Sequence, residues 1–204
     1  METTRAEAFS DGVFAIAITL LVLDLRVPHA ANLTPGELLN AWPHYFAYVV
    51  SFLTIGVMWM NHHTIMGHVT RVDRPLLVIN LLLLMGVVAI PFPTTLVAEN
   101  LHGAGRGPIA AAVTYGLVMI AISAGFAGLW IYIVTHASRL GAVLPPQTLR
   151  QSIPGFTLGG AVYAAGTVVA AFGFPLAGLI IFGLLAVYYL FEHLPSPDSD
   201  SPSG

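Results

Sequence analysis

The chain has 204 residues, of which 56% are hydrophobic and only 8% charged, whereas soluble domains carry about 25% charged residues. This composition excludes a soluble globular protein and indicates a polytopic membrane protein, so the lipid bilayer is its first expected partner. The net charge of −3 and the lack of lysine argue against a nucleic-acid partner, and without cysteine there is no disulfide or thiolate chemistry.

The first apolar segment, residues 5–25, begins with polar and charged side chains and then runs apolar from Gly12 to Leu23, interrupted only by Thr19. At about 1.5 Å per residue, a helix of this length crosses a bilayer core of roughly 30 Å. The acidic residues before the apolar run and the absence of a small-x-small exit argue against a cleaved signal peptide. Asp11 falls at or just inside the hydrocarbon edge, where a carboxylate needs a partner or a function.

Five further apolar segments follow, so the sequence predicts an all-α membrane protein with six transmembrane helices. The expected spans are about 5–25, 42–61, 75–97, 108–135, 153–172 and 174–191. Pro91 and Pro93 are expected to bend or end the third span. Residues 1–194 then form one unit, and the tail 195–204, rich in Pro, Ser and Asp, is expected to be disordered.

The arginine distribution predicts the orientation of these spans. With the N-terminus in the cytoplasm, five arginines lie inside and two outside: Arg5, Arg71, Arg74, Arg139 and Arg150 against Arg26 and Arg106. An excess of arginine marks the cytoplasmic side of a membrane protein. Both termini are therefore expected to be cytoplasmic.

Projected on a helical wheel, the first segment carries an aliphatic stripe with Thr19 at its edge. The stripe consists of Gly12, Ile16, Leu20 and Leu23. Asp11 points to nearly the opposite side. Periodicity alone leaves open whether the stripe faces lipid, the interior of the helix bundle or a functional surface.

A second polar group lies at the end of the second span, where Trp59, His62 and His63 share one face of the helix and Asn61 lies beside them. Antiparallel packing brings this end next to the start of the first span, which carries Arg5, Ser10 and Asp11. An imidazole or indole N–H can then satisfy the Asp11 carboxylate. A structural polar network, a proton relay or pH sensor, and a metal site are the three alternatives for this group.

The run R-x-x-x-F-S-D-G at residues 5–12, followed by V-F-A-I-A-I-T-L-L at 13–21, resembles the signature of the lysosomal potassium-channel family (transmembrane protein 175) and its bacterial single-repeat homologues. The likeness covers most of the chain. It implies a non-canonical potassium-channel fold in which the first helix of each subunit lines a central pore. It also implies a homotetramer, and a polar network that joins the FSDG segment to the WxNHH-type residues 59–63.

By position, the resemblance places the constriction at Ile16, Leu20 and Leu23, with Thr19 as one layer where hydroxyls approach the ion. No carbonyl-lined filter of the TVGYG type is present. An aliphatic ring of this kind gates by dewetting, because a narrow apolar throat holds no water until it widens. Asp24 follows at the outer mouth, where repeated copies would concentrate cations; its alternative role is that of a charge at a helix end.

The sequence is therefore interpreted as a potassium-selective cation channel of the bacterial inner membrane, with the permeant potassium ion as its cargo and no cofactor or metal. The first alternative is a proton-coupled transporter or proton leak that uses Asp11 with His62 and His63. The second is a membrane protein without flux, which the aliphatic stripe fits equally well. An enzyme is least favoured, because no nucleophile–base pair or cofactor motif is present and the loops are short.

Overall fold

The computed structural model describes residues 3–25, 35–103, 105–143 and 153–191, and this part of the chain is all-helical. The elements in chain order are α1 (Thr3–Leu20), η1 (Leu21–Asp24), α2 (Pro35–Asn40), α3 (Trp42–Gly67), α4 (Arg74–Val88), α5 (Pro91–Asn100), α6 (Arg106–Thr135), α7 (Ala137–Leu140), α9 (Ile153–Ala171) and α10 (Pro175–Phe191). The predicted tail 195–204 lies outside the described residues.

Among the described residues, four helical stretches are long and apolar enough to cross a membrane on their own: Thr3–Leu23, Trp42–Gly67, Arg74–Asn100 and Arg106–Thr135. Two shorter apolar helices follow, at Leu158–Ala171 and Pro175–Phe191. The third stretch is divided, because α4 ends at Val88 and α5 begins at Pro91. A proline has no backbone N–H to continue the helical hydrogen bonds, so the division falls directly before Pro91.

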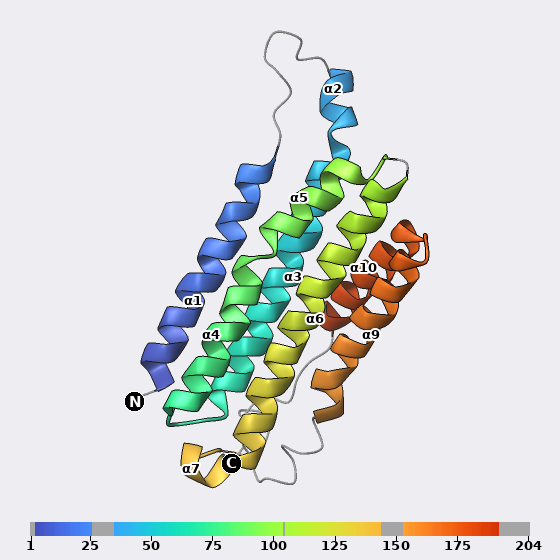
Figure 1. The fold of residues 1–204 in the computed structure, drawn as a ribbon. Helices are drawn as coiled ribbons and strands as arrows, with labels where there is room; N and C mark the ends of the chain where they lie inside the picture. Colours follow the sequence, from blue (N-terminus) through green and yellow to red (C-terminus); the bar gives the residue numbers. More distant parts are fainter. Residues whose placement is uncertain (1–2, 26–34, 104, 144–152, 192–204) are drawn as a thin grey trace.

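The helices form an elongated bundle in which α6 is central (Figure 1). It packs against α4 and α5 on one side and against α9 and α10 on the other. The buried face of α6 follows the helical period with large side chains such as Met119, Ile122, Phe126, Leu129 and Ile133. In contrast, α1 lies at the edge of the bundle, and its main contacts are with α3, α4 and η1.

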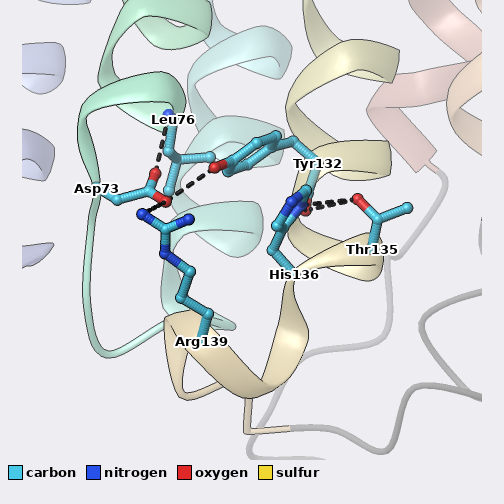
Figure 2. A network of polar contacts seen from close by, with 6 residues as sticks. All are labelled: Asp73, Leu76, Tyr132, Thr135, His136 and Arg139. Carbon is cyan, nitrogen blue, oxygen red and sulfur yellow. Dashed lines mark hydrogen bonds and ion pairs between the residues drawn. The ribbon is translucent and has the colours of Figure 1, made fainter.

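At the end of the bundle where α1 begins, the turn between α3 and α4 is fixed to the end of α6 and to α7 (Figure 2). Asp73 caps α4: its Oδ1 accepts a hydrogen bond from the Leu76 N–H at 3.1 Å. Its Oδ2 accepts one from the Tyr132 hydroxyl at 2.8 Å and lies 3.3 Å from the Arg139 guanidinium. We call Asp73, Tyr132 and Arg139 the corner clamp.

Burial of the Asp73 carboxylate would raise its pKa, but the hydrogen bonds from Leu76 and Tyr132 and the nearby charges of Arg139 and His136 outweigh burial and lower that pKa. The carboxylate therefore stays ionised to lower pH in the folded protein than in the unfolded chain. Its contribution to stability is complete above the ordinary carboxyl pKa of about 3.9 and is lost as the pH falls through the lowered, folded-state pKa.

We expect Asp73→Asn to lower the thermal unfolding midpoint at pH 7 and to reduce the loss of stability on acidification below about pH 4, because the titrating carboxylate is gone. Thermal unfolding in detergent across this pH range measures both effects. Arg74→Gln removes a charge from the neighbouring exposed position and serves as the control. If Asp73→Asn and the wild type lost stability in parallel on acidification, the clamp would contribute nothing to the acid response.

Candidate functional site

One face of α1 and η1 is apolar and is left uncovered by the described part of the subunit. Ile16 is 57% exposed and Leu23 is 76% exposed. The exposed stripe comprises Phe9, Gly12, Ile16, Thr19, Leu20 and Leu23, and Ala8, Ala15 and Val22 are also exposed. The stripe residues recur at the spacing of one helical stripe, and a contiguous exposed stripe on a helix at the edge of the bundle marks either a lipid-facing surface or an interface with other molecules.

The opposite side of the same helix is firmly packed. Ala6, Ser10, Phe14, Ala17 and Leu21 are all at most 3% exposed and face α3 and α4. This buried side is centred about 120° around the helix from the exposed stripe. The direction of the exposed stripe is consequently set by the packing of α1 against the rest of its own subunit.

Thr19 lies on the exposed stripe, and its hydroxyl donates a hydrogen bond within α1. Its Oγ1 donates a hydrogen bond to the Ile16 carbonyl at 2.9 Å. A hydroxyl has one proton and two acceptor lone pairs. With the proton held by the helix, Thr19 offers oxygen lone pairs on the exposed face, which is the arrangement that favours a cation over an anion.

A hydrogen bond between Asp11 and Trp59 joins α1 to α3. The indole Nε1–H donates to Asp11 Oδ1 at 2.8 Å. The carboxylate at the start of the membrane-spanning segment thus has a donor from the neighbouring helix, as a polar group in this environment requires.

A second, fully buried set of hydrogen bonds joins α1, α3 and α4. Asn80 Nδ2 donates to Ser10 Oγ at 2.9 Å, and Asn80 Oδ1 lies 2.7 Å from His62 Nε2. With the amide in this orientation, His62 carries its proton on Nε2 and donates it. Ser10 in turn donates to the Ala6 carbonyl at 2.9 Å, and Phe14 packs against the His62 ring at 5.3 Å.

We call Ser10, His62 and Asn80 the buried triad; each is at most 3% exposed. Asn80 is its central member, and the sequence interpretation did not include it. The signal was present, since Asn80 is an isolated polar residue inside the apolar span 75–97. Such residues in a membrane segment have a partner as a rule.

The comparisons with known proteins identify the family of the chain. A family model described as "Endosomal/lysosomal potassium channel TMEM175" matches residues 5–91, the part of the chain that contains α1, α3 and α4. A potassium channel of Streptomyces collinus is 46% identical to the chain over 208 residues, which cover 98% of this chain and 97% of the relative. The chain belongs to the TMEM175 family.

A solved structure also resembles this fold. The crystal structure of a lysosomal potassium-selective channel TMEM175 homolog from Chamaesiphon minutus matches with a TM-score of 0.81 at 35% identity, covering 92% of this chain and 96% of that one. The Endosomal/lysosomal proton channel TMEM175 of Bos taurus is 41% identical over 97 residues, which cover 43% of this chain and 20% of the animal protein. The TMEM175 family consists of ion channels and not of enzymes, so the protein is a multi-pass membrane channel.

Within this TMEM175 chain, the structure separates the two histidines that the sequence placed on one face. His62 points into the core toward Asn80, whereas His63 lies at the surface and stacks on Trp59. His63 Nδ1 is 2.7 Å from Glu7 Oε1, a partner that the sequence interpretation did not include. Asp11 and His62 therefore belong to two separate hydrogen-bonded groups.

Two of the expected site residues, Arg5 and Asn61, stand apart from these groups. Arg5 is exposed and Asn61 is half-buried, and neither side chain forms a hydrogen bond or ion pair with another of the described residues. Asp24 is the last residue of η1, and its side chain lies outside the described part of the structure. In the described ranges, no three His, Cys, Asp or Glu side chains are grouped so that they could hold a metal ion.

Proposed function

We propose that the protein is a potassium-selective channel in which the exposed stripe of α1 from several subunits lines a central ion path. The observation that carries this proposal is the exposed apolar stripe on an edge helix whose opposite side is locked into its own subunit. One helix cannot enclose a pore, so copies of the chain must assemble around an axis. We propose a homotetramer in the inner membrane, as the family resemblance implies.

The subunit is proposed to cross the membrane six times. Four crossings correspond to the long apolar stretches. The remaining two correspond to α9 and α10, whose 19 and 17 residues span about 25 to 29 Å, close to the thickness of a hydrocarbon core. An even number of crossings places both termini on one side, and the excess of arginine assigns that side to the cytoplasm.

Ile16, Leu20 and Leu23 form the proposed constriction, with Thr19 as the layer that offers hydroxyl oxygens. Rings of aliphatic side chains close an ion path by excluding water. When the throat widens, an ion passes only if it can shed or distort part of its hydration shell, and this costs less for potassium than for sodium. The acceptor lone pairs of Thr19 offset part of that cost. Asp24 at the outer end of η1 is proposed to concentrate cations at the mouth.

The polar groups behind α1 are proposed to be structural and not part of the ion path. The buried triad holds α1 against α3 and α4, and Trp59 holds Asp11 at the edge of the same contact. No cofactor or metal is proposed, and the potassium ion is the cargo of the channel.

Proton conduction is the second candidate function, because the relative from Bos taurus is named a proton channel. It would use the same pore or the Asp11 and His63 groups near the surface of the subunit. His62 is less suited to a relay, since it is fully buried and already paired with Asn80.

Bi-ionic recordings from purified protein in planar bilayers, with potassium on one side and sodium on the other, test both candidates. Potassium selectivity predicts a reversal voltage displaced toward the potassium equilibrium value. A tenfold permeability ratio corresponds to about 1.4 kcal/mol of discrimination between the ions. A current that instead follows an imposed pH gradient would favour the proton channel, and a silent protein with its assembly intact would refute both candidates.

A further inference from the structure

Asp73 makes more contacts than a helix cap needs. A capping side chain accepts one or two N–H groups of the first helical turn. Asp73 does this with Leu76 and in addition accepts from Tyr132 on α6 and pairs with Arg139 on α7 (Figure 2). The start of α4 is thereby fixed to two other segments that lie far from it in the sequence.

Backbone hydrogen bonds reinforce the same junction. The N–H groups of Thr70 and Arg71 donate to the Leu140 carbonyl at 3.2 and 3.1 Å, and the Val143 N–H donates to the His68 carbonyl at 3.0 Å. The turn that leads into α4 and the segment around α7 therefore form one hydrogen-bonded unit, which the corner clamp joins to α6.

The helix α4 connects this junction to α1. Asp73 and Asn80 are seven residues apart, so they lie on nearly the same face, two turns or about 10 Å apart. Leu76 between them is buried. Asn80 holds Ser10 of α1 through the 2.9 Å hydrogen bond. A rotation or axial shift of α4 at Asp73 must therefore displace the partner of Ser10.

We propose that Asp73, with Tyr132 and Arg139, is a positioning residue for conduction: the corner clamp sets the position of α4, and through Asn80 and Ser10 the position of the α1 stripe. This inference rests on the proposed function only where it concerns current. The mechanical part, from Asp73 to α1, stands on the contacts alone.

The contributions within the clamp are unequal. The Arg139 side chain is 63% exposed while that of Asp73 is 15% exposed, and ion pairs with an exposed partner contribute little. The Tyr132 hydroxyl and the Leu76 N–H are therefore the stronger contacts. The other charged or titratable groups around Asp73 are His136, which stacks on Tyr132 at 4.2 Å, and the exposed Arg71 and Arg74 on its own segment.

Hydrogen–deuterium exchange on the assembled channel tests the mechanical part. Tyr132→Phe removes one donor to the carboxylate and leaves the ring in place. Asp73→Asn keeps a good capping side chain but removes the charge. Each variant is expected to raise the exchange rate of α1 residues 6–17 by roughly tenfold, the size expected for losing one hydrogen bond to a charged group. Arg74→Gln, next to Asp73 and outside the clamp, is expected to leave that exchange unchanged.

The same variants are then compared in bilayers, where Tyr132→Phe and Asp73→Asn are expected to change the potassium current several-fold and Arg74→Gln is not. The proposal would be overturned if exchange became faster only in α4, α6 and α7, while the exchange rate of α1 and the potassium current stayed equal to those of Arg74→Gln. If Tyr132→Phe and Asp73→Asn did not assemble, Arg139→Gln would replace them, because it removes only the exposed partner of Asp73. This variant must also raise the exchange rate of α1, by a smaller factor, or the proposal fails. A wild type without potassium current but with coupled exchange would refute the proposed function and leave the mechanical link standing.

Discussion

Replacing Ile16 with asparagine is expected to produce a channel that assembles normally but leaks. Ile16 is 57% exposed in the subunit, so the substitution removes little packing from the folded chain. In the proposed pore, the same position recurs in every subunit and forms a ring of side chains around the axis. A ring of asparagine amides holds water, whereas a ring of aliphatic side chains excludes it. The throat then conducts hydrated ions, and we expect the potassium-to-sodium permeability ratio to fall by roughly tenfold, equivalent to about 1.4 kcal/mol.

Leu117→Asn is the matched control for this substitution. Leu117 on α6 has the same exposed fraction, 57%, and an asparagine there removes the same kind of side chain from a surface away from α1. Both variants are measured by the bi-ionic reversal voltage and by the size of the assembled particle. Unchanged conductance and selectivity in Ile16→Asn and also in Leu20→Asn would show that the α1 stripe does not line the ion path.

Asn80→Ala is expected to destabilise the subunit by about 2–5 kcal/mol. The substitution leaves the His62 Nε2–H and the Ser10 hydroxyl, both fully buried, without their shared partner. The unpaired His62 N–H costs about 1–3 kcal/mol, Ser10 loses a donor but keeps its bond to the Ala6 carbonyl, and the lost side chain leaves a cavity. The unfolding midpoint in detergent should fall, and the loosened contact between α1 and α4 should reduce the fraction of assembled channel.

Asn61→Ala provides the control, because Asn61 is the same residue type but is only half-buried, and its side chain forms no hydrogen bond with the described residues. This substitution should lower the free energy of unfolding by less than about 1 kcal/mol, and the midpoint should shift little. A midpoint for Asn80→Ala equal to that of Asn61→Ala would mean that the buried triad does not hold α1. A loss of current alone, without a loss of stability, would show that Asn80 acts on conduction and not on the stability of the subunit.

Much of the candidate site follows from local sequence. The stripe of α1 repeats at the helical period, so the sequence alone groups Ile16, Leu20 and Leu23 on one face. The hydrogen bond between Trp59 and Asp11 could also be predicted, because antiparallel packing brings the end of the second span beside the start of the first. Both inferences need only the pitch of a helix and the order of the spans.

The remaining contacts depend on how helices rotate against each other, and the sequence carries little information on that. His62 and His63 are neighbours in the chain, yet one turns into the core and the other to the surface. Asn80 belongs to a span that does not directly follow α1, so its bond to Ser10 needed the arrangement of three helices. The pairing of Asp73 with Tyr132 joins residues 59 positions apart and leaves no local pattern.

Thiol accessibility tests the central claim, that the α1 stripe faces the ion path, most directly. The chain contains no cysteine, so a single introduced cysteine is the only target of a charged, membrane-impermeant thiol reagent. Leu23 is 76% exposed and Leu21, two residues away, is 2% exposed. The reagent is expected to reduce the potassium current of Leu23→Cys strongly and to leave the current of Leu21→Cys and of the wild type unchanged. Equal, unaffected currents in both variants, with labelling of Leu23→Cys verified by mass spectrometry, would contradict the claim.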